Sequence, residues 1–403
     1  MKILYVTSSF DKKGSASIRN VSLVNGLVEN GVKVDVLTQC WPDYMIDHDL
    51  KSNINESVNI YYDSIKVIDL YFSKIKPGQD GRGHGRRLLS IIKSLVKYIY
   101  YFPDIDKEWI TNYNRSIDYK SYDLVVSSSD TKTSHFVANK IVKNEHRAKW
   151  FQIWGDPWVD EKGTTGVRKV FAYIFEKWLL REGDEILYIS LPTLEAMKKK
   201  YYKYSSKMHY LKRSYLVEIR GKCAPKPDEG YTFSYIGTVY YGRNIMPLIE
   251  VIDKYNNKKN KKISLNIYGT YSHEVLEACR KYSNINYCGY IEYNKVVEVT
   301  YNSDVLIYMG NMKESHQIPG KLYDYFGTDR TILALMESLD NPVSKFIEQS
   351  NRCILFENNK DLINLDVVVE QVEQNNQRVL SEYSKEEVAK HLLDVFEKYR
   401  DNL

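Results

Sequence analysis

The start of the chain alternates between an apolar run and an apolar helical stripe. Residues 2–7 form a continuous run of strand length, typical of a strand buried on both faces. Apolar positions then recur with helical spacing from Ile18 to Val28, Gly31 supplies a stop, and residues 32–37 repeat the strand pattern. This order predicts a βαβ unit, which implies a parallel sheet with right-handed crossovers.

The same alternation continues along the chain, with one interruption. Further strands are predicted at 124–127, 150–154, 186–190, 233–236, 263–268, 285–288, 305–308, 331–335 and 353–356. Helical stripes lie between them, as at 134–143 and 167–178, and a last amphipathic helix runs from Val388 to Tyr399. Periodicity is lost over 213–230, where the stretch GKCAPKPDEG is typical of a linker.

The pattern therefore predicts two doubly wound, Rossmann-like α/β domains. We place an N-terminal domain at 1–215, a C-terminal domain at 222–385, and a C-terminal helix at 386–403 that packs back on the N-terminal domain. We expect the two domains to face each other across a cleft, because open α/β sheets bind ligands at the carboxyl ends of their strands. The fold alone does not indicate which reaction, if any, the protein catalyses.

The amino-acid composition excludes several classes of protein. Among 403 residues, 43% are hydrophobic and 27% charged, which excludes a disordered polymer, a collagen and a disulfide-stapled miniprotein. A net charge of +5 does not indicate a nucleic-acid binder. The five cysteines are scattered and form no CxxC, which favours a reducing compartment. With neither a secretory signal nor an apolar run of roughly 18 residues, we expect a cytoplasmic protein.

Two segments of the first domain could carry chemistry. In the loop after the first strand, Gly14 and Ser15 would let the backbone approach an anion, although an ordinary βα turn fits equally well and neither GxGxxG nor a P-loop is present. His135 begins the helix after the 124–127 strand, and Asp156 follows the next strand. A buried structural imidazole is the alternative for His135, and Gly-Asp-Pro turn chemistry favours a structural Asp156.

The predicted C-terminal domain contains more closely spaced candidate binding residues than the N-terminal one. Gly237 ends a strand and Arg243 follows it, where an arginine suits a diphosphate, with a solvated arginine as the alternative. After the 305–308 strand, a polar loop holds Glu314, His316 and Gln317. Pro319 and Gly320 then open a helix on which Lys321 could hold phosphate and Asp324 could accept hydrogen bonds from a ribose diol.

These segments together resemble family 4 glycosyltransferases of the GT-B fold, of the kind found in bacterial polysaccharide assembly. The resemblance runs through SSSDTKTSH, FPDIDKEW, GDPW, FSYIGTVYYGRN, NYCGYIEYNKVVEVTYNSDVLI and IPGKLYDYF…TILAL. It implies a hexosyltransferase that uses a nucleotide-sugar and retains the anomeric configuration, with no metal and no cofactor. The acceptor, implied to be a glycan or a lipid- or protein-linked group, would bind the N-terminal domain and the nucleotide the C-terminal one.

The resemblance also implies roles for single residues. Arg243 matches the basic residue that binds the donor phosphate, Thr238 stands where a second basic residue is frequent, and Tyr290 and Ile291 match the segment that holds the base. The second of the family's paired glutamates matches Asp324, and the first matches His316, two residues after Glu314. His135 matches a histidine that reaches the donor sugar or acceptor, and Asp156 is a further catalytic candidate.

The implied mechanism is front-face substitution, in which the leaving phosphate takes the acceptor proton. Two alternatives stay open. A non-hydrolysing nucleotide-sugar epimerase would need further acidic and histidine acid/base residues. A catalytically silent glycosyltransferase-like subunit is favoured by His316 at an expected acidic position.

Residues 82–102 (RGHGRRLLSIIKSLVKYIYYF) combine five basic residues with a broad apolar face. Such a segment suits the surface of an anionic membrane and a lipid-linked acceptor at its inner face, whereas a helix packed on the first domain fits equally well.

Overall fold

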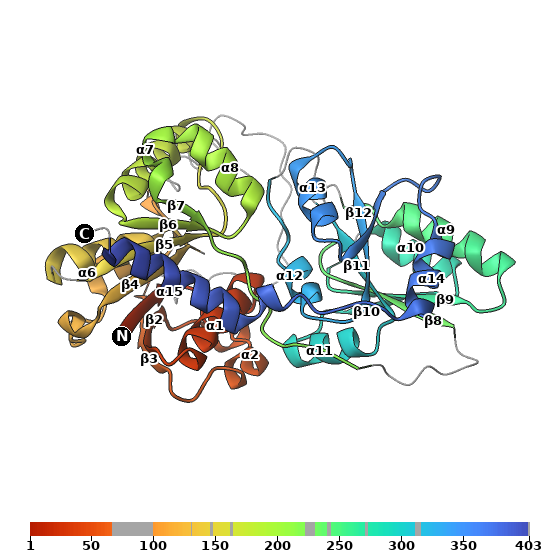
Figure 1. The fold of residues 1–403 in the computed structure, drawn as a ribbon, viewed down its shortest axis with the longest axis horizontal. Helices are drawn as coiled ribbons and strands as arrows, with labels where there is room; N and C mark the ends of the chain where they lie inside the picture. The colour runs from red at the N-terminus through yellow and green to blue at the C-terminus, as the bar shows by residue number, and fades with distance from the viewer. Residues whose placement is uncertain are drawn as a thin grey trace, which may run out of the picture. The chain divides into compact units, whose positions relative to one another are not determined.

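Two parallel sheets organise the chain, one in each of two units (Figure 1). The computed structural model describes residues 1–66, 100–129, 131–145, 148–161, 164–221, 230–239, 243–270, 273–310 and 316–401. Unit 1 contains Met1–Ile189, Thr193–Leu211 and Ala389–Leu403, and unit 2 contains Ser190–Pro192 and Lys212–Val388. The doubly wound architecture predicted from the apolar runs is confirmed.

The sheet of unit 1 has seven strands in the order β3-β2-β1-β4-β5-β6-β7. In chain order they are β1 (Lys2–Thr7), β2 (Lys33–Gln39), β3 (Asn59–Asp63), β4 (Leu124–Ser129), β5 (Lys149–Trp154), β6 (Glu185–Tyr188) and β7 (Met208–Tyr210). The helices are α1 (Ser15–Glu29), α2 (His48–Ser52), α5 (Trp109–Asn112), α6 (Thr133–Glu145), α7 (Val167–Glu182), α8 (Leu191–Lys200) and α15 (Lys385–Asp401).

The central strands of unit 1 are buried on both faces, as their continuous apolar runs predict. Tyr5 of β1 pairs with Val36 on one side and Val126 on the other, and all three are inaccessible to solvent. The edge strands β3 and β7 were not among the strands predicted. They are short, and β3 is mostly half-exposed, so neither carries the apolar run that reveals a central strand.

Helix α15 packs on the unit 1 sheet. The ring centroids of Phe396 and Phe151 lie 6.0 Å apart, and the Tyr399 hydroxyl donates to Asp184 Oδ1 at 2.7 Å. Phe151 lies on β5 and Asp184 directly precedes β6, so α15 packs at these two neighbouring strands. Among the helices that the structure describes, none combines the length and the apolarity needed to cross a bilayer.

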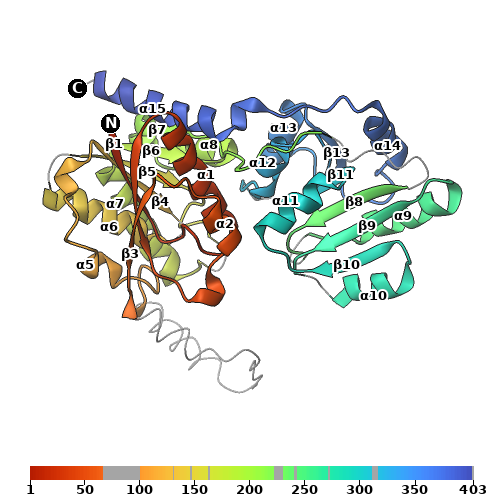
Figure 2. The same ribbon diagram turned by 90° about the horizontal axis from the view of Figure 1, so that it is seen from below.

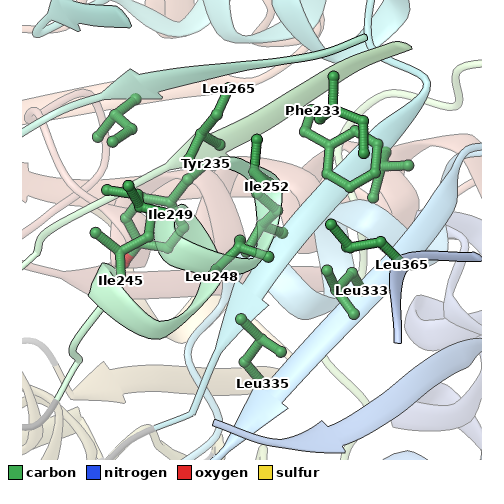
Figure 3. Close-up of a cluster of buried hydrophobic side chains, with 14 of the residues drawn as sticks. Phe233, Tyr235, Ile245, Leu248, Ile249, Ile252, Leu265, Leu333, Leu335 and Leu365 are labelled. Carbon is green, nitrogen blue, oxygen red and sulfur yellow. The ribbon is translucent and has the colours of Figure 1, made fainter. Parts of the chain in front are cut away.

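The sheet of unit 2 has six strands in the order β10-β9-β8-β11-β12-β13, with β8, β9 and β10 side by side in Figure 2. They are β8 (Tyr231–Ile236), β9 (Ile263–Tyr268), β10 (Ile285–Gly289), β11 (Val305–Met309), β12 (Thr331–Met336) and β13 (Cys353–Glu357). The helices are α9 (Met246–Lys258), α10 (His273–Lys281), α11 (Tyr293–Tyr301), α12 (Lys321–Phe326), α13 (Pro342–Gln349) and α14 (Leu365–Gln374). Aromatic side chains of β8 and aliphatic side chains of β9, β12 and α9 belong to its largest core cluster (Figure 3).

Strand order marks one place in each unit where ligands tend to bind. In unit 1, β1 lies between β2 and β4, and in unit 2, β8 lies between β9 and β11. The crossover direction reverses at these positions, so the loops after the central strands diverge and leave room for a ligand at the carboxyl ends.

Candidate functional site

A half-buried lysine lies at the carboxyl end of β8 in unit 2. Lys321, the first residue of α12, donates through Nζ to the Ile236 carbonyl at 3.2 Å, and Nζ lies 3.8 Å from the centroid of the Tyr235 ring. Gly237 makes room for it, since a Cβ there would lie 2.7 Å from Lys321 Nζ, and its φ of 154° favours glycine. Both predicted residues therefore belong to one site.

Arg243 supplies a second positive charge to the same site. Burial lowers the pKa of Lys321 well below its ordinary value, and the charge of Arg243 lowers it further. Burial raises the pKa of Tyr235 to about 12, while Arg243 acts in the opposite direction. Two cationic side chains that share one poorly solvated environment repel each other, so a bound anion would stabilise both.

A buried tyrosine hydroxyl lies beside these cations. Tyr308 of β11 is inaccessible to solvent, and within the described residues its hydroxyl has no hydrogen-bond partner. Burial, first, and nearby Tyr323 raise its pKa well above the ordinary value, while Arg243 lowers it. The proton of Tyr308 is thus firmly held and available to donate.

Asp324 of α12 adds an acceptor. One carboxylate oxygen, Oδ2, lies 3.9 Å from the Arg213 guanidinium, and the other, Oδ1, is buried without a hydrogen-bond partner among the described residues. Burial raises the pKa of Asp324, and Arg213 partly offsets this. Arg213 itself lies against Gly320, where a Cβ would collide with the guanidinium. The carboxylate keeps accepting capacity for a hydroxyl donor.

The other predicted donor residues differ in how deeply they are buried. The Thr238 carbonyl accepts from the Tyr235 hydroxyl at 2.8 Å. Tyr290 and Ile291 follow β10, with Tyr290 61% exposed. His316 is exposed and its carbonyl accepts from Ser190 Oγ at 3.0 Å, and Gln317 is half-buried. Glu314 lies outside the described residues. The structure thus brings Lys321 and Arg243 together with Gly237, and leaves His316 on the surface.

His135 of unit 1 is fully buried at the start of α6. Its Nδ1 lies 2.7 Å from Ser127 Oγ, and Ser127 Oγ accepts from the Trp150 indole at 2.8 Å. The ring centroids of His135 and Trp154 lie 4.5 Å apart, with the rings tilted by 32°. Burial lowers the pKa of His135 well below its ordinary value, with Lys132 and Arg19 adding to the effect. The ring is therefore neutral, with Nδ1 directed at Ser127 Oγ and with Nε2 buried without a hydrogen-bond partner among the described residues.

The other predicted residues of unit 1 are at the surface. Gly14 and Ser15 are exposed at the start of α1, whereas Arg19 is buried and donates to Ser128 Oγ at 2.8 Å. Asp156 is exposed, and its carbonyl accepts from Lys132 Nζ at 3.5 Å.

The sequence analysis quoted FPDIDKEW without singling out its two aspartates, of which Asp104 is half-buried and Asp106 buried. Asp106 accepts from the Gln39 amide and the Thr131 hydroxyl, both at 2.7 Å. Asp104 accepts from the Lys132 backbone N–H at 2.6 Å, and burial, together with Asp106, raises its pKa to about 7. Among the described residues, no group of His, Cys, Asp and Glu side chains is arranged to hold a metal ion.

Solved structures resemble the chain over nearly its whole length, although no family model and no curated protein sequence matches it. The lipopolysaccharide outer core galactosyltransferase WaaB, in its apo form, has a TM-score of 0.54 at 14% identity, covering 99% of both chains. HepE of Anabaena, solved with UDP and glucose, has a TM-score of 0.55 at 8% identity, covering 100% of this chain and 99% of its own.

An epimerase has the same architecture. The UDP-GlcNAc 2-epimerase of Neisseria meningitidis, bound to UDP-GlcNAc, has a TM-score of 0.51 at 13% identity, covering 99% of this chain and 100% of its own. Identities at this level carry information about the fold and not about the reaction. The chain therefore has the GT-B fold, which glycosyltransferases and a nucleotide-sugar epimerase share among these neighbours.

Proposed function

We propose that the protein is a glycosyltransferase whose nucleotide-sugar donor binds to unit 2. The observation that carries the proposal is the cation pair at the carboxyl end of β8, where Lys321 and Arg243 share a buried environment beside Tyr235. A diphosphate supplies the negative charge that this environment lacks. The site lies at the point of reversed strand order, where open α/β sheets bind nucleotides.

The same cations would assist the reaction. When the sugar leaves, negative charge develops on the diphosphate, and fixed positive groups in a poorly solvated site stabilise that charge without reorganisation. Arg243 offers paired N–H donors and Lys321 a point charge, which is a suitable combination for phosphate oxygens. The departing nucleoside diphosphate is thereby stabilised more than the intact donor.

Asp324 and the end of β10 would hold the nucleoside. The free Oδ1 of Asp324 would accept from a ribose hydroxyl, and Tyr290 with Ile291 would contact the base. Arg213 keeps a positive charge 3.9 Å from Asp324, which favours the ionised, accepting form of the carboxylate.

The transfer would retain configuration by front-face substitution. The acceptor hydroxyl attacks the anomeric carbon from the side of the leaving group, the bond to the diphosphate oxygen breaks, and the acceptor proton moves to that oxygen. No metal and no protein nucleophile is needed. In unit 1, the neutral His135 and Asp156 would serve the acceptor, which we expect to be a glycan or a lipid- or protein-linked group.

Calorimetric titration with UDP, GDP and pyrophosphate tests the donor site. Lys321→Met and Arg243→Met should each weaken nucleotide binding about 10- to 100-fold, because each loses a charge-assisted hydrogen bond. Lys254→Met removes an exposed lysine of α9 and should bind as the unchanged protein does. Unchanged affinity in both site variants would contradict the assignment.

A labelled nucleotide-sugar distinguishes a glycosyltransferase, an epimerase and a catalytically silent subunit. Label recovered in a lipid or glycan extract supports transfer, and label recovered in an isomer of the nucleotide-sugar supports the epimerase alternative. Nucleotide binding without either product, with candidate partner proteins present and absent, supports a silent subunit. Inversion of the anomeric centre in the product would overturn the retaining mechanism while leaving the donor site intact.

A further inference from the structure

A polar pocket lies at the amino end of the unit 2 sheet. Asp304 and Arg330, which directly precede β11 and β12, line one side of it, and residues at the end of α14 line the other. The donor site lies at the opposite, carboxyl end of β8, so the pocket is not part of it. The pocket holds about 370 Å³ of empty space, part of which is open to solvent.

Two carboxylates and one arginine line this pocket, and backbone contacts fix all three. Asp304 Oδ2 accepts from the Thr232 N–H at 2.8 Å, and Asp329 Oδ2 accepts from the Gly221 N–H at 2.9 Å. Arg330 is 4% exposed and donates through Nη2 to the Gly221 carbonyl, while its Nη1 lies 3.3 Å from Asp329 Oδ1. Two negative charges and one positive charge leave the pocket net negative, so it repels an anion such as phosphate.

Two polar atoms of this group lack a hydrogen-bond partner. Among the described residues, Nε of Arg330 and Oδ1 of Asp329 are buried without one. The first atom is a donor and the second an acceptor, and they belong to neighbouring side chains. A hydroxyl group both donates and accepts, so hydroxyls suit this pair, whereas an anion only accepts and an ammonium group only donates.

The rim of the pocket adds an aromatic ring and side-chain amides. Tyr301 is 39% exposed at the end of α11, and its ring centroid lies 5.4 Å from the Arg330 guanidinium carbon. Asn302 and Asn375 are exposed, and Gln377 is half-buried. A pyranose has a C–H face that suits an aromatic ring, and hydroxyls at its edge that suit amides and carboxylates.

From this we propose that the pocket is a second carbohydrate site, which binds one pyranose unit of a neutral glycan through the Tyr301 ring and the polar groups of Asp329 and Arg330. The two carboxylates disfavour a phosphate, and the buried guanidinium disfavours a metal ion. A glycan held here would keep a growing polysaccharide on the protein without occupying the donor site, and that role rests on the proposed function. The binding itself involves residues of unit 2 alone, and not the 82–102 segment, of which residues 82–99 lie outside the described residues.

Saturation-transfer NMR with the full chain tests the binding. The probes are the methyl glycosides of glucose, galactose, mannose and N-acetylglucosamine, each measured with and without an excess of UDP. At least one glycoside should receive saturation from the protein, and UDP should not displace it. The uronic acid that corresponds to a bound hexose should bind less well, because the pocket already carries a net negative charge.

Variants assign the binding to this pocket. Tyr301→Ala should weaken it about fivefold, because the ring that covers the C–H face is lost, and Tyr301→Phe should preserve it. Tyr202→Ala is the control, since it removes a tyrosine of unit 1 that is 83% exposed, and it should bind as the unchanged protein does. Asp304→Asn keeps an oxygen acceptor for the Thr232 N–H and removes one negative charge, so it should favour the uronic acid over the neutral sugar more than the unchanged protein does.

Three results would overturn the proposal: none of the four glycosides receives saturation, UDP displaces the bound glycoside, or Tyr301→Ala binds it as well as Tyr202→Ala does. UDP titration shows that each variant is folded. Glycoside binding by a protein that fails to bind UDP would support this site and contradict the proposed donor site.

Discussion

At the scale of single residues, Lys321 shows how a binding site can lower the stability of the protein while no ligand is bound. Burial and Arg243 both oppose its charge, so the pKa of Lys321 is low while no anion is bound. Between that lowered pKa and the ordinary lysine pKa, the unfolded chain binds more protons than the folded one. In that window the contribution of Lys321 to stability rises with pH.

Nucleotide binding should therefore take up a proton at Lys321. Above roughly pH 7, where the terminal phosphate of UDP is already ionised, UDP affinity should fall as pH rises through the lowered pKa of Lys321. Tyr235 faces the same group, and because burial raises its pKa to about 12 it keeps its proton throughout this range. Calorimetry in two buffers of different ionisation heat should show proton uptake that is absent in Lys321→Met. Equal uptake in that variant would place the titration elsewhere.

Tyr308 makes a second residue-scale prediction, since its buried hydroxyl lacks a partner among the described residues. Tyr308→Phe should raise the free energy of unfolding by about 1 kcal/mol, because the cost of an unsatisfied buried group is removed. Tyr5→Phe is the opposite control, since the Tyr5 hydroxyl donates to Asn20 at 2.9 Å and its loss should destabilise by about 1 kcal/mol. Urea unfolding measures both, and a destabilised Tyr308→Phe would show that its hydroxyl is satisfied.

Local patterns in the sequence singled out individual candidate residues, but they did not reveal how deeply each side chain is buried. Lys321 and Arg243 were predicted because a helix start and a strand end flag them. Asp104 and Asp106 were missed because their environment comes from distant partners such as Gln39, which no local pattern reveals. The exposure of His316 could not be predicted, because it depends on how elements pack, whereas the buried imidazole considered as the alternative for His135 agrees with its burial in the structure.

At the scale of elements, the central strands could be predicted because burial on both faces requires an apolar run. The edge strands β3 and β7 could not be predicted in this way, since a strand with one open side does not need a continuous apolar run.

A prediction at the scale of elements concerns helix α6. The Asp104 carboxylate accepts from the backbone N–H groups of Lys132 and Thr133, at 2.6 and 3.2 Å, at the start of this helix.

The pH dependence of stability should reflect this carboxylate. Burial and Asp106 raise the pKa of Asp104 to about 7 in the folded protein, so the folded state holds more protons than the unfolded one between pH 3.8 and that value. Stability should consequently fall as pH rises through this window. Asp104→Asn keeps an oxygen acceptor and should flatten the dependence in thermal unfolding from pH 5 to pH 8, whereas Asp118→Asn, at an exposed 3-10 turn, should not.

At the scale of the whole molecule, the proposed mechanism relies on cationic side chains to stabilise the charge of the leaving diphosphate. Sugar transfer should proceed unchanged in EDTA, because Lys321 and Arg243 occupy the role that a divalent ion has in metal-dependent transferases. The measurement is the initial rate of labelled-sugar transfer with EDTA, and then with added manganese or magnesium. Activity that disappears with the chelator and returns with the metal would contradict the front-face scheme proposed above.

The way α15 belongs to unit 1 has a consequence for synthesis on the ribosome. The strands of unit 1 leave the ribosome first, but Phe396 and Tyr399, which cover Phe151 and reach Asp184, come after the whole of unit 2. The nascent unit 1 sheet therefore waits with an uncovered apolar face while more than 150 further residues of unit 2 are made, which lasts on the order of 10 seconds at ordinary elongation rates. An uncovered apolar face of this kind favours aggregation of an incompletely folded chain until α15 packs on it.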